Sequence, residues 1–113
     1  MCNKNLNITE FSNNISDWIY IWVLLNSSSN ERKQQIILKK INQKNFKKDI
    51  IEAINVYFDL TMNANLREYN NRYDFAEWIF DVINLNYKLE NYIPMDTFIQ
   101  SLMRATENFL INY

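Results

Sequence analysis

Carboxylates are the residues of this chain whose type and spacing come closest to offering catalytic chemistry. Glu77 and Asp81 are four residues apart, so on a helix they lie one turn apart, which suits a hard metal ion. The chain has no histidine, no glycine and one cysteine, Cys2. This excludes Cys/His zinc sites, histidine-based triads, P-loops, dinucleotide fingerprints and the Glu-x-x-His motifs of di-iron bundles. We therefore predict a protein that is not an enzyme, with no catalytic residue, metal site or cofactor, and interpret both carboxylates as part of a solvated stripe.

The helix that positions these carboxylates is predicted over residues 74–88. Its strongly polar residues recur at spacings of three and four and form one narrow stripe: Asp74, Glu77, Asp81, Asn84 and Lys88. Apolar residues fill nearly every other position. Because an ordinary surface helix buries one face, we expect this helix to bury most of its circumference at the centre of a small all-α domain.

Composition and length indicate a single domain without a membrane span. The chain has 113 residues, of which 48% are hydrophobic and 15% aromatic, enough to build one core. The longest apolar run, residues 18–25, is too short to cross a bilayer, and no signal-peptide pattern is present. One cysteine permits no internal disulfide, which favours a reducing, cytoplasmic location. Abundant Asn, Ile and Lys beside absent Gly indicate an A/T-rich genome.

We expect residues 1–11 to form a flexible arm and residues 12–113 to form about six helices with short connections. The expected helices begin near Asn13 or Ser16, and then near Ser28, Phe46, Leu66, Asp74 and Pro94. Ser28 and Glu31 fit a capping box, and Pro94 suits the first turn of the last helix. The first helix is apolar on every face between residues 18 and 25, so part of its surface exceeds what one core needs and predicts an interface.

Charge is divided unevenly along the sequence. Residues 31–48 hold seven Lys or Arg against one acid, and residues 49–113 hold ten acids against four bases, giving net charges of +6 and −6. The basic candidates for an anionic partner are Lys33, Lys39, Lys40, Lys44, Lys47 and Lys48. A nucleic-acid patch and a solvated face both fit this pattern. We favour the solvated face, because only one aromatic residue, Phe46, stands among the lysines.

Two segments resemble a known family. The segment S-D-W-I-Y-I-W, residues 16–22, resembles the Y-I-Y-W signature early in the poxvirus Bcl-2-like immune modulators of the vaccinia type. The segment F-I-Q-S-L-M-R-A-T-E-N-F-L, residues 98–110, resembles the F-x-x-L-F-x-M-x-E pattern of their closing helix. Cellular Bcl-2 relatives carry Asn-Trp-Gly-Arg at the start of the central helix. Here residues 77–80 keep only Trp78, which argues against binding of pro-apoptotic helices in the familiar way.

The resemblance implies a compact Bcl-2-like domain without a membrane anchor and a non-enzymatic virulence factor of the host-cell cytoplasm. Such proteins bind host proteins to inhibit innate signalling towards NF-κB or interferon, and in some cases apoptosis, and several form homodimers. The expected dimer or partner interface comprises Trp18, Tyr20, Trp22, Phe98, Leu102 and Phe109. A candidate groove comprises Ile50, Ile54, Tyr57, Phe58, Tyr69, Tyr73 and Trp78. The alternative is a small phage or bacterial regulator, of anti-CRISPR or nucleic-acid-binding type, that uses the basic residues 31–48.

Overall fold

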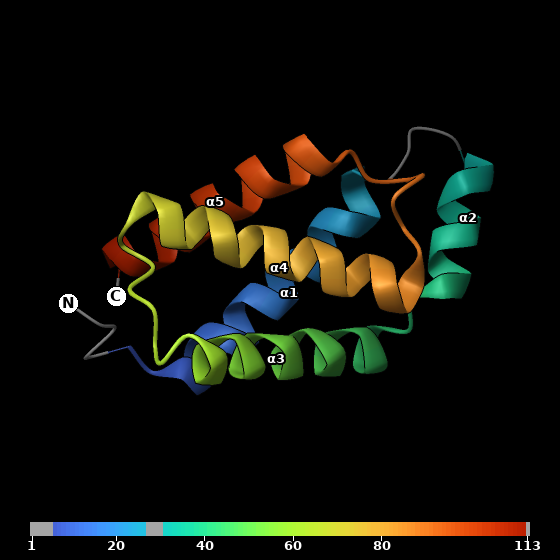
Figure 1. Cartoon of the computed structure of the whole chain (residues 1–113). Helices are drawn as coiled ribbons and strands as arrows, with labels where there is room; N and C mark the ends of the chain where they lie inside the picture. Colours follow the sequence, from blue (N-terminus) through green and yellow to red (C-terminus); the bar gives the residue numbers. More distant parts are fainter. Residues whose placement is uncertain (1–5, 27–30, 113) are drawn as a thin grey trace.

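The computed structural model describes residues 6–26 and 31–112, and these form five α-helices without any strand (Figure 1). The helices are α1 (Ile8–Asn26), α2 (Glu31–Lys40), α3 (Gln43–Leu60), α4 (Tyr69–Tyr87) and α5 (Met95–Asn112). The all-α class is confirmed, but the predicted count of six is wrong for the described residues. The segment that begins at Leu66 does not form the separate helix that was expected, because its residues are shared between a turn and α4. Leu66 is buried in a turn, and the residues from Tyr69 onwards belong to α4.

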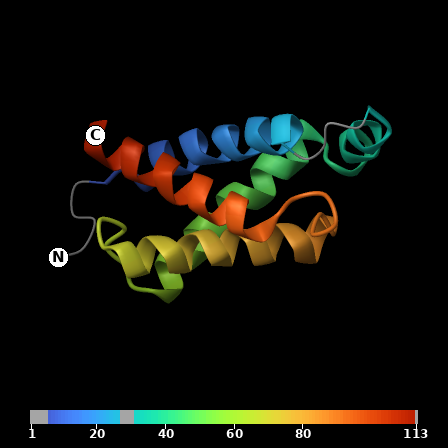
Figure 2. The same cartoon turned by 90° about the horizontal axis from the view of Figure 1, so that it is seen from above.

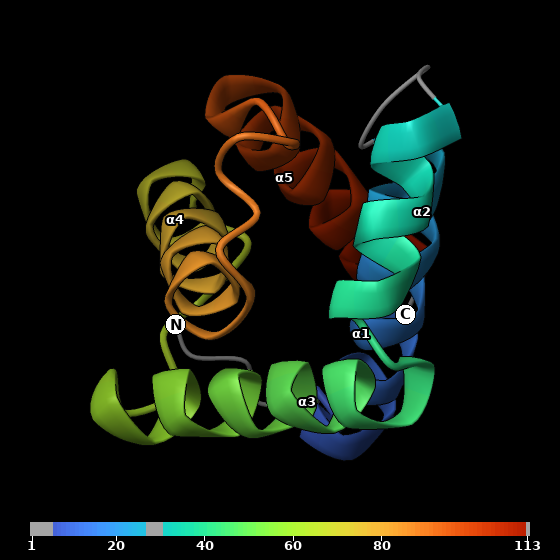
Figure 3. The same cartoon turned by 90° about the vertical axis from the view of Figure 1, so that its right-hand side faces the viewer.

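The four long helices surround one elongated core. Successive long helices run in opposite directions, and α2 lies at the end where α1 leads into α3 (Figures 1 and 3). Each of α1 and α4 packs against both α3 and α5. α3 crosses the other helices obliquely (Figure 2), so the arrangement is not a regular parallel-sided bundle. The molecule measures 45 × 23 × 23 Å.

The prediction of a central helix is wrong, because no helix in the described part of the chain is enclosed by the others. The buried residues of α4 lie on one face at three–four spacing: Arg72, Phe75, Ala76, Ile79, Phe80 and Ile83. On its outer side, Leu85 is 80% exposed and Tyr69 is 59% exposed. The physical reason is that four amphipathic helices share the core, and aromatic side chains fill the space that a central helix would occupy.

The N-terminal arm is also shorter than expected. α1 begins at Ile8, and the Asn7 side chain accepts a hydrogen bond of 3.0 Å from the backbone N–H of Glu10. Asn7 and Glu10 thus have the spacing of a capping box, which could have been read from the sequence. Phe11 is fully buried. Residues 8–11 therefore belong to the folded domain, whereas residues 1–5 lie outside the described residues.

The other helix ends follow local sequence signals. Asn42 caps α3 by accepting hydrogen bonds from the backbone N–H groups of Lys44 and Asn45, so α3 begins earlier than the expected Phe46. Lys88 has φ of 52° and ends α4 in the left-handed region. α5 begins directly after Pro94, as predicted. The expected cap Ser28 lies outside the described residues.

Two tyrosine–carboxylate hydrogen bonds join α3 to α4. The Tyr57 hydroxyl donates to Asp74 Oδ2 over 3.0 Å, and the Tyr87 hydroxyl donates to the Asp49 carboxylate. Burial, and then the adjacent carboxylate, raise the pKa of Tyr57 above its usual value. The same two causes, in the same order, raise the pKa of Tyr87. Both phenols are therefore held in the protonated, donating form.

Replacing Tyr57 or Tyr87 with phenylalanine should reduce the loss of stability that the protein shows above about pH 10. Each phenol has a higher pKa in the folded chain than the unfolded value of 10.0. Its stabilising contribution is complete below the unfolded pKa and is lost as the pH rises towards the folded pKa. At pH 8, each substitution should cost about 1 kcal/mol through the lost hydrogen bond. Thermal unfolding at about pH 8 and about pH 11 measures both effects. Equal alkaline losses in the wild type and both variants would refute this assignment.

Candidate functional site

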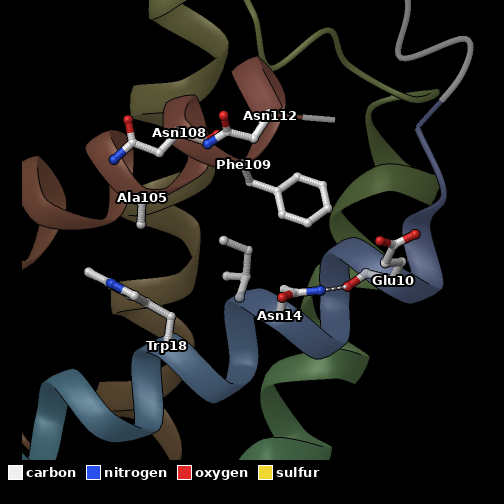
Figure 4. A pocket seen from close by; sticks show the side chains of 8 residues that line it. Glu10, Asn14, Trp18, Ala105, Asn108, Phe109 and Asn112 are labelled. Atoms are coloured by element: carbon white, nitrogen blue, oxygen red, sulfur yellow. Dashed lines mark hydrogen bonds between the residues drawn. The ribbon is translucent and has the colours of Figure 1, made fainter.

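A hollow of 570 Å³ lies between α1 and α5 (Figure 4). Its lining residues are Glu10, Asn14, Ile15, Trp18, Ala105, Asn108, Phe109 and Asn112. Trp18 projects from α1 and Phe109 from α5 towards the space between the helices. A second hollow of 230 Å³ continues along the same helices and adds Trp22, Ser101 and Arg104. We call the two together the α1/α5 groove.

An apolar stripe of α1 borders this groove. Trp18 stacks on Trp22 with ring centroids 6.2 Å apart, and the Trp22 ring meets Phe98 edge-on at 5.4 Å. Both tryptophans are only partly buried. Ile21 and Leu25 follow Trp18 at helical spacings and are 54% and 73% exposed. This side of α1 therefore presents apolar surface that the core does not use.

The wall formed by α5 combines small side chains with two larger ones, Arg104 and Phe109. Ser101 and Ala105 are four residues apart on the flank of α5 that faces α1, and Asn108 follows on the same flank. These short side chains leave the space beside the tryptophans unfilled. Sequence reasoning missed this wall, although the four-residue spacing of small residues beside an apolar face was a visible signal.

The structure places three of the six residues predicted for the interface at the α1/α5 groove. Trp18, Trp22 and Phe109 line the α1/α5 groove. Phe98 and Leu102 are fully buried, so their prediction as surface residues is wrong. They lie on the amphipathic face of α5, and that face forms the core.

Tyr20 is directed away from the α1/α5 groove. Its ring packs against Phe46 of α3, with centroids 6.0 Å apart, and Lys47 Nζ lies 5.7 Å from its centroid. Tyr20 therefore supports the contact between α1 and α3. Its predicted place on the same surface as the two tryptophans is wrong.

The residues that were predicted to form a candidate groove, apart from the dimer interface, do not line a common groove. Four of them belong to the core and are at most 3% exposed: Ile50, Ile54, Tyr57 and Phe58. Tyr69 and Tyr73 are exposed on α4. Trp78 is partly buried, and its indole N–H donates to the Ala53 carbonyl over 3.0 Å. Side chains of the core thus fill the space where this groove was expected.

A different hollow, of 310 Å³, lies between α3 and α4 and includes Trp78. Its lining residues are Asp49, Glu52, Ala53, Val56, Trp78, Val82 and Asn86. We call it the α3/α4 groove. Its apolar lining residues are Ala53, Val56, Trp78 and Val82, and the carboxylates of Asp49 and Glu52 line it from α3.

The predicted basic residues lie on α2 and the first turns of α3. Lys33, Lys39, Lys40, Lys44 and Lys48 are exposed. Lys47 forms a salt bridge of 2.6 Å with Asp17, and Lys40 Nζ donates to the Tyr87 carbonyl over 3.3 Å. Lys47 and Lys40 are thus engaged within the domain.

Arg72 is a buried charge that sequence reasoning did not single out. Its Nη1 donates to the carbonyls of Leu66 and Arg67, and its Nη2 pairs with Glu107 of α5, each over 3.0 Å. These bonds hold the turn before α4 against α5. The residue is structural, because its polar contacts are made to groups of the chain itself.

Neither a metal centre nor a membrane span is found in the described part of the chain. Within residues 6–26 and 31–112, no three His, Cys, Asp or Glu side chains are placed to hold one ion. None of the described helices is long and apolar enough to cross a bilayer. Comparisons with protein-family models, curated proteins and solved structures found no match.

Proposed function

We propose that this chain is a non-enzymatic protein-binding domain that associates with a second copy of itself through the α1/α5 groove. The observation that carries the proposal is the partly exposed tryptophan pair beside an open groove, continued by Ile21 and Leu25. Tryptophan is enriched at the centres of interfaces, and a contiguous apolar stripe on one helix marks a surface for association.

The same surface carries both a ridge and a recess, which supports a second copy as the occupant. The side chain of Ile21 projects from α1 into solvent. The short side chains of Ser101 and Ala105 leave a recess on the neighbouring flank of α5. In a two-fold dimer, each copy applies the same patch, so a ridge can enter the partner's recess twice. The short polar side chains at the edge, such as Asn108, suit the wetter rim of an interface.

We further propose that this dimer acts in the host-cell cytoplasm as a viral inhibitor of innate immune signalling, towards NF-κB or interferon induction and in some settings apoptosis. Support comes from the resemblance to poxvirus Bcl-2-like modulators at residues 16–22 and 98–110. Those segments lie on α1 and α5, the two helices that form the groove. The Bcl-2-like class is supported by these segments and not by an enclosed central helix. We do not extend the proposal to nucleic acid, because Phe46, the aromatic residue among the lysines of residues 31–48, is fully buried and offers no face for a base.

Expression of the chain in mammalian cells should lower NF-κB or interferon-β reporter activity, and Ile21→Glu should restore it. The charged side chain would lie in the proposed interface, while the position itself is already half exposed and tolerates a polar residue in the monomer. Leu60→Glu, at a site that is 68% exposed on α3, is the matched control and should inhibit like the wild type. Immunoblots verify equal expression. Reporter activity unchanged by the wild-type chain, or equal inhibition by Ile21→Glu, would contradict the proposal.

A further inference from the structure

Two hollows, of 230 and 190 Å³, lie where the start of α4 faces the second half of α5. Figure 2 shows that α5 crosses α4 obliquely and that the two helices diverge towards the start of α4 and the end of α5. Arg72 and Glu107 line both hollows, Arg67 lines the first and Arg104 lines the second. Three arginines and one carboxylate therefore line this surface, which we call the arginine site.

Two of the three arginines have their guanidinium groups available to a ligand. Arg67 and Arg104 are exposed, and within residues 6–26 and 31–112 neither side chain forms a hydrogen bond or an ion pair. Glu68 follows Arg67 directly, but its carboxylate accepts a hydrogen bond from Asn71 Nδ2 and does not line the site. Each free guanidinium presents a planar fork of N–H donors that matches a carboxylate.

Arg72 places a third positive charge beside both hollows, although it is only 8% exposed. Its Nε–H group has no hydrogen-bond partner among the described residues. The side chain of its ion-pair partner, Glu107, is 51% exposed, so solvent weakens the compensation of the buried charge. The arginine site therefore keeps a net positive charge and favours an anionic ligand.

The first hollow also has an apolar wall. Leu110 and Ile111 of α5 line it together with Arg67, and Ile111 is 72% exposed. A small inorganic anion would leave this apolar surface in contact with water, whereas a peptide side chain can cover it. Clusters of arginines are also a recurrent means of recognising acidic peptide motifs. The ligand that fits is therefore a peptide with an apolar side chain next to a carboxylate.

We propose that the arginine site binds an acidic segment of a partner protein. One carboxylate of this segment pairs with Arg67 and a second pairs with Arg104, while an apolar side chain contacts Ile111. The affinity falls as salt is added, because both arginines are exposed and their charges are screened. Arg67 does not line the α1/α5 groove, so this binding goes beyond the proposed dimer and can be separated from it.

The test is the fluorescence anisotropy of a labelled, end-blocked peptide of alternating Glu and Leu, titrated with the full chain at about 20 mM and about 500 mM salt. Binding should be saturable at low salt and should be lost at high salt. A peptide with Gln in place of every Glu should not bind, and inorganic phosphate at the concentration of the peptide should not displace it. No saturable binding, equal binding of both peptides, or displacement by phosphate would overturn the proposal.

Variants of the chain locate the contact. Arg67→Gln should weaken binding of the Glu–Leu peptide about tenfold, and circular dichroism should show unchanged helix content because Arg67 is exposed. Arg104 also borders the α1/α5 groove, so Arg67 is the position that reports on the arginine site alone. Lys44→Gln/Lys48→Gln is the control for general charge attraction and should bind like the wild type, as should Ile21→Glu. Wild-type affinity in Arg67→Gln, or a loss confined to Lys44→Gln/Lys48→Gln, would contradict the assignment.

Discussion

Replacing Phe11 with alanine should lower the free energy of unfolding by about 4 kcal/mol, a large part of the stability of a domain of this size. Phe11 is fully buried, and its ring centroid lies 5.9 Å from that of Phe58, 5.8 Å from Phe75 and 5.2 Å from Phe109. One side chain at the start of α1 thus joins α3, α4 and α5. Its removal takes away apolar contact and leaves a cavity that three separate helices cannot easily close. Urea denaturation followed by circular dichroism measures the cost.

Ile111→Ala is the control for this substitution. Ile111 is 72% exposed near the end of α5, and its loss should change stability by less than about 0.5 kcal/mol. If Phe11→Ala cost no more than Ile111→Ala, residues 8–11 would behave as the loose arm that the sequence suggested. The position of α1 in the structure would then be wrong at its first turn.

Trp18→Glu should weaken self-association more than about 100-fold, the largest effect that we expect on binding. The substitution removes a ring that stacks on Trp22 and places a carboxylate in an apolar contact, where an unpaired charge is costly. Sedimentation velocity over a range of concentrations measures the change. Ile21→Glu tests the same surface with less risk to the fold, because Ile21 is 54% exposed. Leu60→Glu, on α3, should associate like the wild type.

Helical class and several helix ends could be predicted because their causes are local. The last helix was expected near its observed position because Pro94 marked its start. The same reasoning missed the start of α1, because the cap at Asn7 was overlooked within a polar segment. Local signals therefore set the limits of the elements, and one overlooked cap was enough to misplace a core residue, Phe11.

The candidate site was harder to predict, since one sequence pattern fits both a core and an interface. Phe98 and Trp22 are aromatic residues on apolar helix faces, yet Phe98 is fully buried and Trp22 is partly exposed. Which face is covered depends on the neighbouring helices, and their arrangement is not a local property. The central position assigned to residues 74–88 failed for this reason. Its apolar residues were counted correctly, but Leu85 and Tyr69 on α4 have no covering helix.

The net charge of each segment is a property of the sequence alone, whereas the pairing of charges depends on the tertiary structure. The net charges of +6 and −6 can be read directly from the sequence. The salt bridge between Lys47 and Asp17 cannot, because it depends on the packing of α1 against α3. Nor could the sequence show that Lys40 donates to the Tyr87 carbonyl at the end of α4.

The most direct test of the central claim is the mass of the wild-type protein at about 500 mM salt, where electrostatic association is screened. Sedimentation equilibrium should give about twice the chain mass of 13.7 kDa, falling towards one chain mass on dilution. Ile21→Glu should remain at one chain mass under the same conditions. A wild-type protein that stays at 13.7 kDa at every concentration would contradict the assignment of the α1/α5 groove as the surface that binds a second copy.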